Sequence, residues 1–314
     1  MTDSIGALGV ERPATEFLWL DLTRKCQLAC VHCYNASGPE GTHGTMTRED
    51  WVDVLDQAVA CGVRDVQLIG GEPTMHPDAL ELAGHALALG LGVEIFSNLV
   101  RVTDEWWALF QREGVTLATS YYSAEAGEHD AMTRRRSHAR TRANIERAVG
   151  LGIPLRVGII GDSRRTIDAA RRDLEALGIT RIGVDHIRAF GRGAREQAPD
   201  AAGLCGQCGT GRACVGPEGE VSPCVFSGWM GVGNVQDAAL ADILGGAAMA
   251  QANATIRSAV GAERACRPDK QDCAPKNNCR PKEPCQPDQA CRPRCGPNTE
   301  CGPGYPSNEC DPKR

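Results

Sequence analysis

The amino-acid sequence predicts an α/β protein whose main part is a partial (β/α)6 TIM-type barrel, open on one side. Between Glu16 and Ile187, short apolar runs alternate with amphipathic helical patterns. The runs are unbroken, as is typical of parallel strands covered on both faces. Strand–helix units of this kind build one parallel sheet, and the six found are too few to close an eight-fold barrel. Chemistry is therefore expected in the loops after the strands.

The individual elements follow from these patterns. Strands are expected at Phe17–Leu20, Val66–Ile69, Val93–Phe96, Val115–Thr119, Leu155–Ile160 and Ile182–Val184. The first long helix follows Thr47-x-x-Asp50, which resembles a capping box, and its apolar stripe runs from Trp51 to Val59. A later helix is entered through Asp162 and Ser163. Glycines that would close three helices stand at Gly62, Gly90 and Gly178.

Composition excludes several functional classes. The formal net charge of −6 argues against a nucleic-acid or anionic-membrane partner. No apolar run approaches the roughly 20 residues that cross a bilayer, and the first residues lack signal-peptide features. Sixteen cysteines in a chain without a secretion signal indicate metal or redox sites in the cytoplasm. Only Cys61, isolated in an apolar stretch, is expected to be a core residue.

The strongest motif follows the first strand, where the spacing is Cys26-x3-Cys30-x2-Cys33. Three closely spaced thiolates can each bind one iron of a cubane and leave the fourth iron open for chemistry. The alternative is a zinc site or an ordinary electron-transfer cluster. Such a site would need a fourth ligand, for which His32 is a candidate, although it is wedged between two ligand positions.

A second motif, Gly70-Gly71-Glu72-Pro73, follows the next strand. Together the two motifs resemble those of the radical S-adenosylmethionine (SAM) superfamily, and the resemblance spans residues 16–193. It implies that Cys26, Cys30 and Cys33 hold a 4Fe–4S cluster whose open iron binds SAM. It also implies reductive cleavage of SAM to a 5′-deoxyadenosyl radical, which abstracts hydrogen from a substrate. The resemblance further implies SAM contacts at Gly70, Gly71, Glu72, Pro73, Ser97, Asn98, Ser120, Arg140, Val157 and Ile159.

A second cysteine group, Cys205, Cys208, Cys214 and Cys224, surrounds a predicted hairpin turn at Pro217–Gly219. The pattern resembles the SPASM or twitch extension of radical SAM enzymes, without the later cysteine run of a two-cluster module. It implies one auxiliary 4Fe–4S cluster on Cys205, Cys208 and Cys224, completed by Cys214 or a tail cysteine. The alternatives are a zinc ribbon and, for Cys214, a catalytic role as a hydrogen-atom donor.

These patterns divide the chain into an N-terminal extension (1–15), the barrel (16–193), the auxiliary module (194–258) and a tail (259–314). The polar stretch Ala189–Asp200 is interpreted as a linker. In the tail, each of eight cysteines is followed two residues later by proline. This repeat favours either a metal-binding tail or a disordered thiol-rich extension, with a fused peptide substrate as a third hypothesis.

Three functions remain open on the sequence. The first is modification of a ribosomally synthesised peptide by cross-linking, epimerisation or oxidation. Because only 16 residues precede the first strand, a separate leader-peptide-binding protein is then expected. The second is dehydrogenation or epimerisation of a small natural product such as a sugar or aminocyclitol. The third is a non-catalytic iron–sulfur or metal-binding protein. For the enzymes, the resemblance implies a flavodoxin- or ferredoxin-type electron donor.

Overall fold

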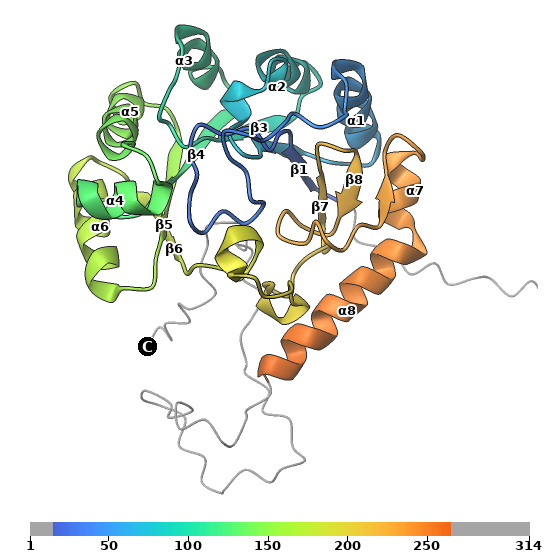
Figure 1. Cartoon of the computed structure of the whole chain (residues 1–314). Coiled ribbons are helices and arrows are strands. Elements are labelled where there is room, and N and C mark those ends of the chain that lie inside the picture. Colours follow the sequence, from blue (N-terminus) through green and yellow to red (C-terminus); the bar gives the residue numbers. More distant parts are fainter. Residues whose placement is uncertain (1–14, 265–314) are drawn as a thin grey trace, which may run out of the picture.

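The computed structural model describes residues 15–264 (Figure 1). Most of the predicted N-terminal extension and almost all of the Cys-x-Pro tail, including all its cysteines, therefore lie outside the described residues. Within residues 15–264, none of the helices has the length and apolar character needed to span a membrane. The account below concerns this part of the chain.

The described residues form one nine-stranded sheet in the order β6-β5-β4-β3-β2-β1-β7-β8-β9. The strands are β1 (Phe17–Asp21), β2 (Asp65–Ile69), β3 (Gly92–Phe96), β4 (Val115–Tyr121), β5 (Leu155–Ile160), β6 (Arg181–Asp185), β7 (Arg212–Val215), β8 (Glu220–Ser222) and β9 (Gly233–Asn234). Strands β1 to β6 pair in parallel with their sequence neighbours. This is the mostly parallel, open barrel that the sequence predicts.

Helices surround the outside of the barrel strands (Figure 1). They are α1 (Arg48–Ala60), α2 (Ala79–Ala88), α3 (Asp104–Phe110), α4 (Ala126–Thr133), α5 (His138–Gly150) and α6 (Arg164–Ala176). Two more helices, α7 (Leu240–Gly245) and α8 (Ala247–Arg264), follow the auxiliary strands, and α8 lies apart from the outer helices (Figure 1). Fully buried side chains such as Leu18, Leu68 and Leu117 fill the space between sheet and helices. Each contributes roughly 1.5–3 kcal/mol through its removal from water.

The sequence signals at the helix ends correspond to real caps. Thr47 caps α1, and its side chain and that of Asp50 satisfy each other's backbone N–H groups, as a capping box requires. Three further glycines close helices in the left-handed conformation, with φ of 86°, 82° and 90° at Gly62, Gly90 and Gly178. One detail was wrong: Val59, placed in the apolar stripe of α1, is 40% exposed.

The auxiliary module continues the barrel sheet. β7 pairs in parallel with β1, so that Leu18 lies beside Ala213, and β8 and β9 then add antiparallel strands. The predicted turn at Pro217–Gly219 connects β7 to β8. The backbone N–H groups of Thr45 and Met46 donate to the Pro217 carbonyl, which fastens the turn to the loop before α1. Barrel and module therefore share one sheet.

The segment interpreted as a linker is packed against the barrel. Phe190 and Ala194 are buried, and a 3-10 turn at Gly191–Ala194 contacts the cysteine loop. A Cβ on Gly191 would lie 2.4 Å from the carbonyl oxygens of Cys33 and Tyr34, so only glycine permits this approach. The linker interpretation of Ala189–Asp200 is thus wrong for Phe190–Ala194, which pack against the cysteine loop, whereas residues 195–200 are exposed.

Candidate active site

The three cysteines of the first motif share one cavity at the carboxyl ends of the barrel strands. Its wall includes Cys26, Cys30 and Cys33 on one side and Gly70 and Gly71 beside them. The empty space measures about 1070 Å³ with its open mouth included. Cavities of several hundred Å³ hold small cofactors, so this one has room for a cluster and a nucleoside-sized ligand.

Hydrogen bonds from neighbouring loops place two of the sulfur atoms. The Cys26 Sγ accepts from the Leu28 backbone N–H at 3.4 Å and from the Asn98 side-chain amide at 3.7 Å. The Cys33 thiol lies 3.0 Å from Asn35 Oδ1, and Ser37 donates to the same oxygen at 2.7 Å. The sulfur atoms of Cys26 and Cys33 are therefore held by polar groups, two of which, Asn98 and Ser37, also line the cavity.

The burial of the three thiols suits them to bind a positively charged iron–sulfur core. Burial raises the pKa of Cys30 to about 12 and also raises the pKa of Cys26 and Cys33. Buried thiols of this kind become thiolates only when a metal supplies compensating charge. Within residues 15–264, no three His, Cys, Asp or Glu side chains are placed to hold one metal ion. A cubane differs from such a site because each thiolate binds a separate iron.

Arg192, which also lines the cavity, holds the cysteine loop in place. Its Nε donates to the Cys30 carbonyl at 2.7 Å, and its two terminal nitrogens donate to Ala36 and Ser37 carbonyls at 2.7 and 2.6 Å. Its backbone N–H donates to the Cys33 carbonyl at 2.9 Å. One planar guanidinium thus satisfies three carbonyls of a loop without regular structure.

The glycine motif after β2 serves chain packing as well as the cavity. A Cβ on Gly70 would lie 2.7 Å from the Thr23 carbonyl oxygen, and one on Gly71 would lie 2.4 Å from that of Lys25. The N–H of Gly71 donates to Thr23 at 2.6 Å. Both glycines therefore let β2 approach the backbone that leads into the cysteine loop.

Glu72 of this motif is a buried hydrogen-bond acceptor. Its carboxylate accepts from Ser97 Oγ and the Asn98 N–H, both at 2.8 Å, and from Thr74 Oγ1 at 2.7 Å. Burial raises the pKa of Glu72, and these hydrogen bonds oppose the shift. Glu72, Pro73 and Ser97 do not line the cavity, but the Glu72 carboxylate holds the backbone of Asn98, which does.

The remaining predicted SAM contacts divide in two. Ser120 lines the cavity, as Gly70, Gly71 and Asn98 do. Val157 and Ile159 instead pack into the hydrophobic core, and Gly158 and Ile160 line the cavity in their place. Successive side chains of a strand alternate between faces, so Val157 and Ile159 face the core while Gly158 and Ile160 face the cavity. Arg140 is exposed on α5 and is not among the cavity residues.

Several cavity residues were not among the predicted SAM contacts. Tyr122 lies beside the cluster loop, where its ring meets His32 edge-on at 4.8 Å and its hydroxyl hydrogen-bonds the Cys30 thiol. Arg188 forms two bonds to the buried Asp185 carboxylate, at 3.0 and 3.2 Å. Tyr122, Asp185 and Arg188 all lie at or after a strand's carboxyl end. The barrel rule alone could have selected them.

Three cysteines of the auxiliary module come together. The Cys208 thiol contacts those of both Cys205 and Cys224, and all three are packed in one apolar cluster with Phe190. Cys214 belongs to the same cluster, yet among the described residues its thiol has no hydrogen bond to the trio. A second chamber, with about 940 Å³ of empty space, is lined by Cys214.

This second chamber adjoins the first cavity. Tyr34, Val225 and Phe226 line both, and the rings of Tyr34 and Phe226 meet edge-on at 5.0 Å. The Tyr34 hydroxyl is buried without a hydrogen-bond partner within residues 15–264. At the chamber's rim, Trp229 is 44% exposed. A substrate in this chamber would reach the cavity past Tyr34 and Phe226.

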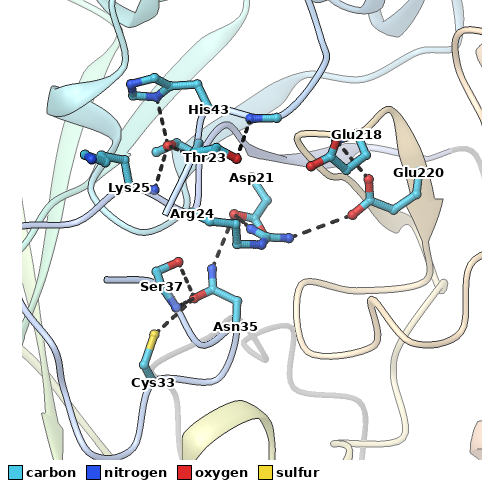
Figure 2. A network of polar contacts seen from close by, with 12 residues as sticks. Asp21, Thr23, Arg24, Lys25, Cys33, Asn35, Ser37, His43, Glu218 and Glu220 are labelled. Carbon is cyan, nitrogen blue, oxygen red and sulfur yellow. Dashed lines mark hydrogen bonds and ion pairs between the residues drawn. The ribbon is translucent and has the colours of Figure 1, made fainter. Parts of the chain in front are cut away.

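Charged groups connect the cysteine loop to the hairpin across this chamber (Figure 2). Arg24 pairs with Asp21 at 2.6 Å and approaches Glu220 of β8 at 3.8 Å. Asn35, which contacts Cys33, donates to Asp21 at 3.5 Å. Burial raises the pKa of both carboxyl groups, and Arg24 opposes that shift.

Comparison with known families decides the identity of this site. The sequence model of the radical SAM superfamily matches residues 20–177, half of the 314-residue chain. The chain belongs to the radical SAM superfamily. An iron–sulfur cluster-binding domain of the SPASM type matches residues 205–280. Together these matches imply a 4Fe–4S cluster with SAM in the barrel and auxiliary iron–sulfur chemistry in the module.

Among curated proteins, this radical SAM enzyme resembles peptide-modifying relatives. It is 32% identical over 192 residues to the PqqA peptide cyclase of Streptomyces rochei, covering 59% of this chain and 52% of that protein. It is 31% identical over 177 residues to the mycofactocin maturase MftC of Mycobacterium tuberculosis, covering 55% and 45%. The chain thus spans about half the length of the curated relatives it matches.

Solved structures confirm the radical SAM fold. The Streptococcus suis SuiB complex with its precursor peptide SuiA superposes with a TM-score of 0.66 at 16% identity, covering 79% of this chain and 67% of SuiB. BtrN in complex with AdoMet and 2-DOIA gives 0.53 at 14% identity, covering 80% and 91%. At these identities the likeness concerns the fold.

Proposed function

We propose that this radical SAM enzyme abstracts a hydrogen atom from a ribosomally synthesised peptide, and so begins a cross-link, an epimerisation or an oxidation. The observation that carries the proposal is the second chamber, which meets the cluster cavity at Tyr34 and Phe226. Its exposed rim at Trp229 suits a chain that continues beyond the site. Similarity to a peptide cyclase and a maturase supports the same substrate class.

In this proposal Cys26, Cys30 and Cys33 hold the cluster. When bound and reduced, the cluster and SAM together supply a 5′-deoxyadenosyl radical. Asn98 and Ser120, with the backbone at Gly70 and Gly71, line the space for SAM. The chain's own part is to orient these partners and to keep water and other hydrogen donors from the radical.

Cys214 is proposed as a hydrogen-atom donor from the chamber wall, the alternative being a fourth ligand of the auxiliary cluster. Burial raises the pKa of its thiol, which keeps the proton on sulfur. The S–H bond would break as a C–H bond forms on the substrate, leaving a sulfur-centred radical. One electron from the external donor and one proton from solvent then restore the thiol.

Anaerobic turnover with SAM, a one-electron reductant and candidate short peptides tests the substrate class. We expect 5′-deoxyadenosine formation to rise when the peptide is present. The peptide should change in mass or, if it is epimerised in deuterated solvent, gain deuterium. The variant Cys30→Ala should abolish both. Cys61→Ala is the matched control, because Cys61 lies at the end of α1 away from the cavity. The proposal would be contradicted if the enzyme turned over sugars or aminocyclitols and none of the peptides tried.

Iron analysis separates the two roles of Cys214. If Cys214 donates hydrogen, Cys214→Ala retains the iron content of the wild type and loses deuterium uptake into the peptide. Cys208→Ala, which removes the central thiol of the trio, should instead lose about one cluster's worth of iron. An equal loss of iron in both variants would assign Cys214 to the cluster.

A further inference from the structure

A group of exposed arginines lies beside the cluster loop. Arg134, Arg135 and Arg136 lie in the turn between α4 and α5, and Arg140 lies in the first turn of α5. All four are exposed, and none forms an ion pair with any residue in 15–264. They stand out in a chain whose formal net charge is −6. We call Arg134, Arg135, Arg136 and Arg140 the arginine rim.

The end of α4, which leads into the arginine rim, is hydrogen-bonded to the backbone on both sides of Cys30. The N–H of Ala29 donates to the Thr133 carbonyl at 3.1 Å, and the N–H of Val31 donates to the Met132 carbonyl at 2.9 Å. Met132 and Thr133 immediately precede Arg134 in the chain. The rim therefore begins one residue beyond the bonds that hold a ligand of the SAM cluster.

The turn that presents the arginines is well ordered by its own contacts. Arg134 adopts the left-handed conformation at φ 58°, and the Thr133 hydroxyl bonds the Ser137 hydroxyl at 2.8 Å. The Asp130 carboxylate accepts from the N–H groups of Ser137 and His138, both at 2.9 Å. The nearest acidic side chain of α4 is thus engaged with the turn's backbone. The arginines remain available to another molecule.

The arginine rim lies outside the substrate path. None of its members lines the cluster cavity or the second chamber. A partner bound there would approach Cys30 from its outer side and leave the route past Tyr34 and Phe226 free. Of the molecules that the proposed function requires, only the electron donor acts on the cluster without entering the cavity.

We propose that the arginine rim is the docking surface for an acidic one-electron carrier protein. The inference rests on the proposed radical SAM function. In the step it serves, the carrier is oxidised by one electron and the cluster is reduced by one, with no bond formed or broken. Opposite charges bring such partners together quickly and orient them, and the effect weakens with salt.

The test follows reduction of the cluster itself, in the reconstituted full-length chain. Because the auxiliary cluster also absorbs visible light, all variants carry Cys208→Ala, and stopped-flow bleaching of the remaining cluster is measured with a reduced acidic flavodoxin and, separately, with reduced methyl viologen. For Arg134→Ser/Arg135→Ser/Arg136→Ser we expect the second-order rate constant with flavodoxin to fall about 10-fold or more at low salt. Because viologen is a small cation that needs no docking surface, its rate should stay within about 2-fold.

The control carries the same charge change elsewhere. Arg112→Ser/Arg172→Ser/Arg181→Ser removes three exposed arginines that lie away from the cluster loop. The rate at which flavodoxin reduces the cluster should be unchanged in this variant. The charge-retaining Arg134→Lys/Arg135→Lys/Arg136→Lys variant should keep most of the flavodoxin rate. Arg140→Ser is a milder second variant, in case the triple change disturbs the turn.

Three results would overturn the proposal: an unchanged flavodoxin rate, an equal fall in the control, or a parallel fall with viologen in both rim variants at full iron content. Weaker peptide binding with a normal flavodoxin rate would reassign the rim to an acidic peptide segment. Cluster reduction needs no substrate, so the docking result stands or falls separately from the peptide proposal.

Discussion

At the cluster loop, one guanidinium satisfies three carbonyls that regular secondary structure leaves unpaired. Arg192 bonds Cys30, Ala36 and Ser37 from a segment more than 150 residues later in the chain. The loop must hold three thiols at fixed positions while its own backbone is irregular. Arg192 therefore acts as a positioning residue for the cluster rather than as a reacting group.

Replacing Arg192 tests this role. Arg192→Met should weaken the loop by about 2 kcal/mol, since bonds from a charged donor are among the stronger ones. We expect the cluster to be lost to an iron chelator roughly 10-fold faster or more, as followed by visible absorbance. Arg192→Lys should rescue little, because one ammonium cannot span three carbonyls. Arg195→Met, on the same exposed turn, should behave as wild type.

A buried histidine makes the fold sensitive to acid. His129 is 1% exposed among Tyr121, Tyr122 and His138, and burial lowers its pKa to about 4. In the unfolded chain the same group titrates near 6.5. The unfolded state therefore binds a proton first as the pH falls, and stability is lost between about pH 6.5 and 4.

His129→Gln removes this titration. Relative to pH 7.5, the free energy of unfolding at pH 5 should fall by about 2 kcal/mol less in the variant than in the wild type. Anaerobic urea unfolding at the two pH values gives the comparison. His32 and His76, whose pKa values are also lowered to about 4, are present in both proteins. Both proteins therefore still lose some stability at low pH. Equal pH dependence would contradict the assignment.

At the scale of elements, the close approach of β2 to the cysteine loop depends on Gly71. A methyl group there would lie 2.4 Å from the Lys25 carbonyl oxygen. Gly71→Ala should therefore separate the two segments and destabilise the protein by about 1–3 kcal/mol, with lower iron content after reconstitution. The matched control is Gly161→Ala at the end of β5, where no atom lies within 4 Å of the added methyl. Melting temperature and iron analysis report both effects.

The elements were predictable because their signals are local. Unbroken apolar runs located the six barrel strands to within two residues at each end. The cysteine spacing and the glycine motif likewise placed Cys26 and Gly70 at one end of the sheet. These features depend on neighbours in sequence, which a sequence displays directly.

The missed features depend on distant partners. β5 is an exception, because Arg156 shares a strand face with Gly158, so side-chain alternation could have separated Val157, in the core, from Gly158, in the cavity. Arg192 stands in a polar stretch whose purpose is visible only beside the loop it satisfies. Likewise, only the folded chain shows that the Cys208 thiol contacts Cys205 and Cys224 and not Cys214.

For the whole molecule, the sheet is the unit of stability. β1 lies between β2 and β7, so the auxiliary hairpin covers an edge that the barrel would otherwise expose. A chain ending at residue 193 should therefore aggregate through that open edge. A chain ending at residue 264, which keeps all nine strands, should remain monodisperse in size-exclusion chromatography. Monodisperse behaviour of the shorter chain would show that the barrel is stable without β7.

The contact between Arg24 and Glu220 limits how such enzymes can be recombined. The barrel contributes Asp21 and Arg24, and the hairpin contributes Glu220. A chimera that grafts another enzyme's hairpin onto this barrel must bring a carboxylate at that position. Otherwise it leaves Arg24 with one counter-charge fewer, two residues before the first cluster cysteine. Whether a barrel and a hairpin from two different enzymes are compatible therefore depends on Asp21, Arg24 and the residue at position 220.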